Sequence, residues 1–245
     1  MTTPLPPHIT DLLVRLRTRA GRPCVTWYGD GGERVELSAA VVENWVTKTT
    51  NLLVEEFDAS SSCVIAIDVI PHWRSLVWSL AAWRTGAEVV EGDTGDVVVT
   101  TSPATVSGRD VVAVALPALA RSFDGELPAS AVDAASAVMT YGDQLGWAPP
   151  VDPDAPAVTA PRRITHGEIV AAADDAATGV PAGARALLEA PDTGLVPWLL
   201  CVVGVLVRDG SLVLASTSVA AELRADPDRR ARLVATERVD ADLLG

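Results

Sequence analysis

Two adjacent arginines, Arg162 and Arg163, are the residues best suited to bind an anion. They precede residues 165–168, where Thr165 and the Glu three residues later predict the start of a helix that runs to about Ala177. Free N–H groups at a helix N-terminus and Arg guanidinium groups would attract the same negatively charged ligand. A solvated pair of loop residues is the simpler interpretation, and both stay open.

The histidines predict no metal site, because His8, His72 and His166 are isolated in the sequence. His166 stands in the first turn of the predicted helix, where a surface residue that starts a helix explains it; a ligand role is the alternative. No G-x-S-x-G, H-E-x-x-H, Walker loop or paired C-x-x-C occurs. We therefore expect no catalytic residue, no metal and no cofactor.

Asp192 and Thr193 lie between a predicted strand, residues 184–189, and a predicted buried helix, residues 193–207. Open α/β sheets bind ligands at the carboxyl ends of their strands, which makes both residues candidates for a binding site. Asp is also a preferred N-cap residue, so Asp192 is explained equally well as the cap of the following helix.

The elements that would position these residues predict an α/β fold, layered αβα, with mostly parallel sheets. The apolar run 63–70, closed by Pro71, is typical of a strand buried on both faces, and helix 73–85 and strand 87–90 complete a β-α-β unit. The tail, residues 219–238, predicts a helix with an Arg-rich face and no later strand. The other predicted elements are helix 9–19, the hairpin strands 23–28 and 34–37, helix 39–57, and strands 96–100, 110–116, 157–159 and 211–215.

The prolines and aspartates of residues 148–161 predict an extended linker, because proline excludes regular helix. We therefore expect an N-terminal helix (1–21), a first α/β lobe (22–147), this linker, and a second, incomplete α/β lobe (162–245).

Composition narrows the class of partner. The chain has 245 residues, a formal charge of −13 and no run of Lys or Arg, so we expect neither nucleic acid nor anionic lipid to bind it. Its best apolar stretch, Leu195 to Val207, is shorter than the ~20 residues that span a bilayer.

The N-terminus lacks a basic leader and an apolar signal core, which predicts a cytoplasmic protein. Cys24, Cys63 and Cys201 are expected to be reduced core thiols.

Short phrases along the chain resemble, in order, the N-terminal region of the adenylate-forming (AMP-binding) superfamily of acyl-CoA synthetases, adenylation domains and luciferases. Residues 22–27 and 34–38 resemble its opening hairpin, and residues 64–69 with 73–87 its first strand–helix pair. Residues 152–158 and 165–173 resemble the two flanks of its phosphate-binding loop. Between Thr159 and Thr165 only Ala-Pro-Arg-Arg-Ile remains, without the glycines and lysine of that loop.

The resemblance implies a truncated scaffold that lacks ATP chemistry, because glycines let backbone N–H groups approach phosphates and a lysine neutralises them. We expect a degenerate protein without adenylation activity that acts as a binding or interaction module. The alternative is an enzyme for an acyl, CoA or nucleotide substrate, completed by a partner chain. The resemblance also places Thr159 beside the candidate anion site and residues 190–194 at an acyl pocket entrance.

The resemblance also bears on partners. A shortened sheet would have an edge that the missing half once covered, so we expect self-association or a protein partner at that edge. A small-molecule or acyl ligand is the other expected partner.

Overall fold

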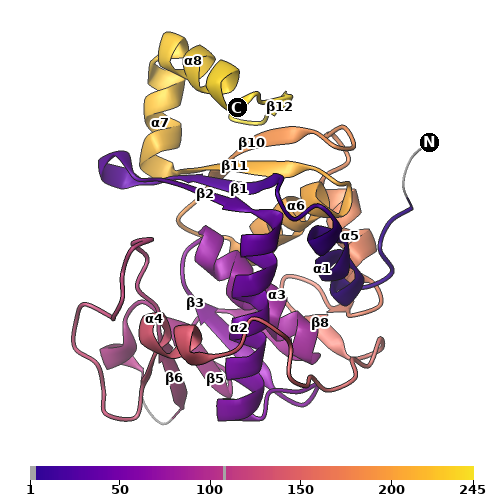
Figure 1. The fold of residues 1–245 in the computed structure, drawn as a ribbon, viewed down its shortest axis with the longest axis vertical. Coiled ribbons are helices and arrows are strands. Elements are labelled where there is room, and N and C mark those ends of the chain that lie inside the picture. Colours follow the sequence, from indigo (N-terminus) through magenta and orange to yellow (C-terminus); the bar gives the residue numbers. More distant parts are fainter. Residues whose placement is uncertain (1–3, 107–108) are drawn as a thin grey trace. The chain divides into compact units, whose positions relative to one another are not determined.

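The computed structural model describes residues 4–106 and 109–245. Residues 1–3, at the N-terminus that was predicted to lack a leader, lie outside the described residues. The chain divides into two compact units. Unit 1 comprises Met1–Val42, Ile70–Trp73 and Val170–Gly245, and unit 2 comprises Glu43–Val69 and Arg74–Ile169. Each unit contains a five-stranded sheet (Figure 1). The predicted α/β class with parallel strands is confirmed.

Unit 2 contains a fully parallel sheet with the strand order β4-β3-β5-β6-β7. All four residues of β5 are buried, as predicted for parallel strands covered on both faces. The elements are α2 (Ala39–Phe57), β3 (Val64–Asp68), α3 (Trp73–Thr85), β4 (Glu88–Glu91), β5 (Val97–Thr100), η2 (Pro103–Thr105), β6 (Asp110–Ala113), β7 (Val132–Asp133), α4 (Ala134–Ala137), η3 (Val138–Thr140), and the antiparallel pair β8 (Pro156–Val158) and β9 (Ile164–Thr165).

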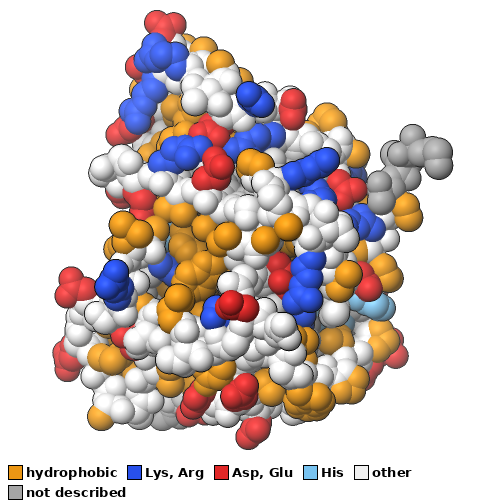
Figure 2. Space-filling view, in the orientation of Figure 1, with side chains coloured by type: hydrophobic (Ala, Val, Ile, Leu, Met, Phe, Trp, Pro, Cys, Tyr) orange, Lys and Arg blue, Asp and Glu red, His pale blue; other side chains and the backbone are white. Residues whose placement is uncertain are grey.

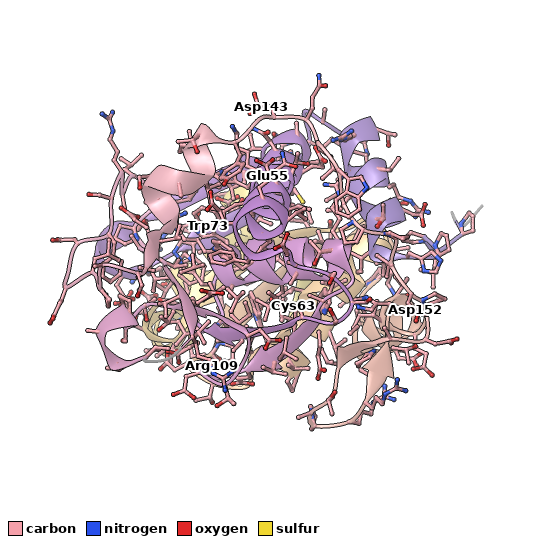
Figure 3. All side chains as sticks on the ribbon, turned by 90° about the horizontal axis from the view of Figure 1, so that it is seen from below. Glu55, Cys63, Trp73, Arg109, Asp143 and Asp152 are labelled. Atoms are coloured by element: carbon pink, nitrogen blue, oxygen red, sulfur yellow. The ribbon has the colours of Figure 1, made fainter. Side chains whose placement is uncertain are left out.

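Polar residues of α2 hold the irregular segment that follows η3. Lys48 forms an ion pair of 2.7 Å with Asp143, and Asn51 donates to the carbonyl of Gln144 at 2.9 Å. The backbone N–H of Gly146 donates back to the Asn51 side chain at 3.1 Å. Figure 3 shows the segment carrying Asp143 running past α2. The polar face of this amphipathic helix therefore binds the chain's own loop.

Unit 1 contains a sheet with the order β12-β10-β11-β1-β2, in which only β2 runs antiparallel. Figure 1 shows these strands side by side, with α7 and α8 on one face and α5 and α6 on the other. The elements are α1 (Ile9–Thr18), β1 (Pro23–Tyr28), η1 (Asp30–Gly32), β2 (Arg34–Ser38), α5 (Ile169–Ala176), β10 (Arg185–Ala190), α6 (Leu195–Val207), β11 (Ser211–Ser216), α7 (Thr217–Ala225), α8 (Pro227–Glu237) and β12 (Ala241–Asp242).

The structure divides the chain differently from the predicted lobes. The hairpin β1–β2 was expected to open the first lobe, but β1 pairs in parallel with β11, from Val25 opposite Leu212 to Tyr28 opposite Ala215. The expected linker, residues 148–161, lies inside unit 2 and contains β8. The pairing of β1 with a strand near the C-terminus makes unit 1 discontinuous in sequence.

Both faces of the unit 1 sheet are covered. Leu187 of β10 and Val213 of β11 pack with Leu223 of α7 in one buried cluster. On the opposite face, α6 contacts β11 and approaches α5 closely: a Cβ at Gly204 would lie 2.0 Å from the carbonyl oxygen of Ala173. Glycine is therefore required where these two helices meet.

The C-terminal tail forms two helices and a strand, so the predicted single helix without a later strand is wrong. Asp226 ends α7 and caps α8 by accepting from the N–H of Arg229 at 2.9 Å, and Pro227 occupies the first turn of α8. The short strand β12 then pairs with Ala186 and Leu187 of β10.

A buried carboxylate, Glu237, fixes α8 to the sheet. It lies 2.7 Å from the Arg185 guanidinium and 2.8 Å from that of Arg34, and it accepts a hydrogen bond of 2.6 Å from the Tyr28 hydroxyl. Figure 2 shows basic and acidic side chains interspersed over α7, α8 and the neighbouring strands. Burial would raise the pKa of Glu237, but these hydrogen bonds outweigh burial and lower it.

No helix in residues 4–106 and 109–245 is long and apolar enough to cross a bilayer. The three cysteines are free thiols: Cys24 is buried, whereas Cys63 and Cys201 are partly exposed. Burial raises the pKa of Cys24 to about 12 and that of Cys63 to about 11. Burial also raises the pKa of Cys201.

Candidate functional site

Three of the predicted site residues occupy one short turn in unit 2. Strands β8 and β9 pair with Val158 opposite Ile164, so the chain reverses within residues 159–163. Thr159, Arg162 and Arg163 are exposed in this turn. The guanidinium of Arg163 donates to the carbonyl of Asp154 at 2.9 Å. The phrase that stands where the resemblance expects a phosphate loop therefore forms a tight hairpin.

The predicted helix start is wrong by three residues: with Thr165 as N-cap the helix would begin at residue 166, but α5 begins at Ile169. Half of the capping box forms: Glu168 accepts from the backbone N–H of Thr165 at 3.0 Å and from its hydroxyl at 3.1 Å. These two bonds, with smaller contributions from the charges of Arg163 and Arg162, lower the pKa of Glu168. The two arginines thus lie near a carboxylate, and not beside a bare helix N-terminus.

His166 is buried, which corrects its interpretation as a surface residue that starts a helix. It is 3% exposed, and its Nε2 lies 2.9 Å from the carbonyl oxygen of Gly86 at the end of α3. The neighbouring indole of Trp83 donates to the carbonyl of Ala157 in β8 at 2.9 Å. Both contacts fasten the β8–β9 hairpin to the rest of unit 2. His166 therefore has a structural contact of its own, whereas Arg162 and Arg163 are exposed in the turn.

The other two predicted residues lie in unit 1, at the carboxyl end of β10. Asp192 and Thr193 are both exposed there. Asp192 does not cap α6, since the N-cap is Gly194 in a left-handed conformation without a side-chain bond. Asp192 instead accepts a hydrogen bond of 3.0 Å from the hydroxyl of Thr217, which follows β11. It therefore links the carboxyl ends of two adjacent parallel strands, and its role in ligand binding stays a prediction.

Sequence reasoning missed a second polar group at the same sheet edge. Asp30 follows β1, and its Oδ1 accepts hydrogen bonds from the hydroxyl of Ser216 at 2.9 Å and from that of Ser218. Hydrogen bonds from the two serine hydroxyls lower the pKa of Asp30, and Ser218 contributes more than Ser216. These residues come together only because β1 pairs with β11. The glycine-rich turn that contains Asp30 was the one local feature of the sequence that could have pointed to this group.

The carboxyl edge of the unit 2 sheet uses its polar groups internally. Thr100, at the end of β5, is fully buried; its hydroxyl donates to Asp68 of β3 at 2.6 Å and accepts from the N–H of Ser102 at 2.9 Å. Asp133 accepts from the backbone N–H groups of Phe123 and Ala135. These side chains hold the loops that follow the strands.

The chemistry available at the unit 1 edge is that of hydrogen-bond acceptors and hydroxyl donors. Within residues 4–106 and 109–245, no group of three or more His, Cys, Asp or Glu side chains could hold a metal ion.

Solved structures show what this fold is similar to. The luciferase-like enzyme from the nonluminescent Zophobas morio mealworm matches with a TM-score of 0.69 at 13% identity, over 98% of this chain and 59% of that one. Brucella canis acyl-CoA synthetase matches with a TM-score of 0.68 at 16% identity, over 92% of this chain and 50% of that one. Acetoacetyl-CoA synthetase from Streptomyces lividans matches with a TM-score of 0.67 at 15% identity, over 85% of this chain and 38% of that one.

The resemblance stated from the sequence is thus confirmed at the level of the fold, which is that of the N-terminal region of adenylate-forming enzymes. The chain spans about 38–59% of the length of these three solved enzymes.

Comparison of sequences gives the family. No protein family model matches the chain. A Mycobacterium tuberculosis (strain H37Rv) protein described as a "TIGR03089 family protein" is 32% identical over 255 residues, which cover 98% of this chain and 98% of that protein. Given this level of identity over nearly the full length of both proteins, the chain belongs to the TIGR03089 family.

Proposed function

We propose that this chain is a degenerate relative of adenylate-forming enzymes that binds a small ligand or a protein and does not form adenylates. The β8–β9 hairpin carries the proposal. Residues 159–163 reverse the chain in a short turn that contains no glycine and no lysine. A phosphate cradle needs several backbone N–H groups that converge on the anion, which glycines normally permit. An antiparallel turn of this length supports a structural role for the segment.

The proposed ligand site is the carboxyl edge of the unit 1 sheet. Asp192 and Thr193 are exposed there, and Thr217 joins Asp192 to the adjacent strand end. Ligands of open α/β sheets bind at this kind of edge, which supports retention of a pocket for a small molecule or an acyl group.

The proposed protein contact is the edge of β10. Its six residues, Arg185–Ala190, pair with β12 only at Ala186 and Leu187. In the described part of the chain, residues 188–190 therefore have no strand neighbour on that side. Unpaired edge positions are where another strand can add to a sheet. Light scattering over a concentration series should show a mass above the 25.6 kDa of one chain; a strictly monomeric mass contradicts this contact.

The decisive test of the proposal is ATP–pyrophosphate exchange with a broad panel of carboxylic acids. We expect no exchange above the blank. Exchange that depends on both acid and ATP would overturn the proposal, since that signal requires adenylate formation.

Calorimetric titration with ATP, AMP and acetyl-CoA, with and without magnesium, tests the arginine turn directly. We expect no micromolar binding of the nucleotides. If such binding occurs, the double variant Arg162→Ala, Arg163→Ala locates it: a loss there, but not in the control Arg121→Ala, places an anion site in the β8–β9 turn. Arg121 is an exposed arginine of the same unit.

A second candidate function is an enzyme completed by a separate chain. It is favoured by the extent of the chain, which spans only 38–59% of the three solved enzymes. Its mark would be pyrophosphate exchange that is absent from the purified chain and restored by a stoichiometric partner that co-purifies with it.

A further inference from the structure

The unit 1 sheet ends at β2 on the side opposite β12 (Figure 1). Among the described residues, β2 pairs only with β1, so its outer side has no strand neighbour. Natural sheets commonly protect such an edge with a proline, a bulge or charged side chains. The five residues of β2, Arg34–Ser38, contain no proline, and their two charges have opposite signs. A strand that adds to this edge therefore has to present the reverse order of charge.

The hydrogen-bond pattern of the β1–β2 hairpin shows which backbone groups of β2 face outward. The N–H of Gly29 donates to the carbonyl of Glu33 at 2.9 Å, so this pair of residues is hydrogen-bonded. Bonded and non-bonded pairs alternate along an antiparallel ladder, and in the observed register Val35 is the next bonded position of β2. The backbone N–H and C=O groups of Arg34 and Glu36 therefore point away from β1. Within residues 4–106 and 109–245, they have no hydrogen-bond partner on that side.

The two faces of β2 differ in character. The guanidinium of Arg34 lies 2.7 Å from the carboxylate of Glu36 and 2.8 Å from that of Glu237, so both charges of the strand are matched within the chain. Their side chains still remain 43% and 42% exposed. Val35 points to the opposite face, because successive side chains of a strand alternate, and it is half-buried. Along its edge, β2 therefore presents a positive, an apolar and a negative side chain in that order.

We propose that β2 pairs in antiparallel fashion with β2 of a second copy of this chain, about a two-fold axis at Val35. In this register Arg34 of each copy lies opposite Glu36 of the other, and Val35 lies opposite its own equivalent. The two residues whose backbone groups point outward then face each other and exchange N–H···O=C bonds. The five-stranded unit 1 sheets of the two copies become one continuous sheet.

Charge selects this register over its neighbours. An axis at Arg34 or at Glu36 would place that residue directly opposite its own equivalent, and like charges opposite each other destabilise a strand pair. An axis between two residues would oppose an outward-facing backbone to one that is bonded to β1. In the proposed register the Arg34–Glu36 pairs of both copies are kept and meet as charges of alternating sign, with Val35 against its β-branched equivalent on the other face.

This self-complementary pattern identifies the partner as a second copy of the chain. A closed two-fold interface uses the same surface on both subunits, so a strand that matches itself in charge, backbone direction and apolar contact satisfies it. The contact is separate from the edge of β10, and it depends neither on a ligand nor on the absence of adenylate formation.

Disulfide trapping on the full chain tests the register. Val35→Cys places two thiols at a non-hydrogen-bonded antiparallel pair, where the Cα atoms are roughly 4.5 Å apart and a disulfide can form. Mild oxidation should give a covalent dimer, and peptide mapping should find the link between the two introduced thiols. Glu36→Cys, one residue along the same strand, places its thiols on a diagonal of roughly 7–8 Å and should cross-link at least about fivefold less. The wild-type chain, with its three native thiols, is the blank.

Sedimentation equilibrium with two variants at Glu36 tests the pairing in solution. The wild-type mass should rise above the 25.6 kDa of one chain with increasing concentration, with a Kd of about 100 µM or tighter. Glu36→Pro removes an outward N–H and leaves the bonds to β1, which an edge strand tolerates, and should weaken dimerisation at least about tenfold. Glu36→Arg opposes Arg34 of the other copy with a like charge and should weaken it to a similar extent. Glu55→Arg, the same change of charge at an exposed residue of α2, should change the Kd less than about twofold.

Three results would overturn the proposal. These are a monomeric wild-type mass between roughly 5 and 500 µM, equal cross-linking of Glu36→Cys and Val35→Cys, or an unchanged Kd in both Glu36→Pro and Glu36→Arg. Thermal unfolding establishes that Glu36→Pro is folded; if it is not, Glu36→Arg compared with Glu55→Arg gives the same decision. A mass above one chain that survives both changes at Glu36 would overturn the β2 contact alone and leave the β10 contact standing. Pyrophosphate exchange has no part in this outcome, so the proposal and the proposed function can fail separately.

Discussion

The carboxyl edges of the two sheets carry similar side chains but use them differently. In unit 2, the Thr100 hydroxyl binds Asp68 in a buried pair, and Asp133 binds backbone N–H groups of the loops. In unit 1, Asp30 accepts from the hydroxyl of Ser216 at the end of β11, Asp192 accepts from that of Thr217, and both carboxylates are exposed. The same strand-end position therefore anchors loops in one unit and joins adjacent strand ends through exposed carboxylates in the other.

The two units also differ in charge. Unit 1 carries twelve of the 19 basic residues and 15 of the 32 acidic ones, whereas unit 2 carries seven and 17. The smaller imbalance of unit 1 comes from its larger number of arginines, several of which form ion pairs around α7 and α8.

The largest effect is expected from breaking the scaffold beneath the unit 1 edge with Glu237→Ala. The variant leaves the Arg185 side chain, 11% exposed, without its carboxylate partner. Removing one partner of a buried ion pair costs about 3–5 kcal/mol of unfolding free energy. Urea unfolding measures this cost. A loss below about 1 kcal/mol would show that Glu237 does not hold α8 to the sheet.

The comparison of the two edges is tested most directly by the matched pair Thr100→Val and Thr217→Val. Thr100→Val removes a hydroxyl from a buried site and leaves Asp68 without that donor, which should cost about 1–3 kcal/mol. Thr217→Val removes a donor from an exposed carboxylate and should cost no more than about 0.5 kcal/mol. Equal costs in urea unfolding would mean that the edges do not differ.

A smaller effect is expected in the pH dependence of stability. The pKa of Glu237 is lower in the folded protein than its ordinary value of 4.5. Its stabilisation is therefore complete above about pH 4.5 and is lost as the pH falls through the lower folded value. Glu237→Gln should reduce the loss of unfolding free energy between pH 5 and about pH 3. An unchanged pH profile in this variant would contradict the assignment.

The smallest effect is expected at the hairpin turn. Arg163→Ala removes one exposed hydrogen bond to the carbonyl of Asp154 and should change the unfolding free energy by less than about 0.5 kcal/mol. A larger change in urea unfolding would give this side chain a structural role. Any ligand-binding defect of a stable variant can then be assigned to the lost contact.

Local patterns in the sequence predicted the regular elements well. Helix α2 was expected at residues 39–57 from its apolar spacing, and the structure has Ala39–Phe57. The buried parallel strands followed from continuous apolar runs with turn residues at both ends. The fold class is confirmed for the same reason, since alternating strands and helices admit few arrangements.

The candidate sites were predicted less well, because they depend on contacts between distant residues. The burial of His166 is set by the carbonyl of Gly86, which no local pattern reveals. Asp192 had the side chain of an N-cap, but Gly194 takes that position with a left-handed backbone. Glu237 lies in a charge-rich tail that resembles an exposed helix, and only the strand partners Arg185 and Arg34 show it to be buried.

The pairing of β1 with β11 also sets the order in which the chain can fold during synthesis. Every residue of unit 2, which ends at Ile169, is synthesised before β10 and β11. The hairpin at residues 23–38 must therefore wait, unpaired on one side, until Ser211–Ser216 emerges to receive it. Closing a loop of that length is slow, and an unpaired strand edge is open to aggregation meanwhile. The N-terminal hairpin is thus the part of the nascent chain most in need of protection by a chaperone.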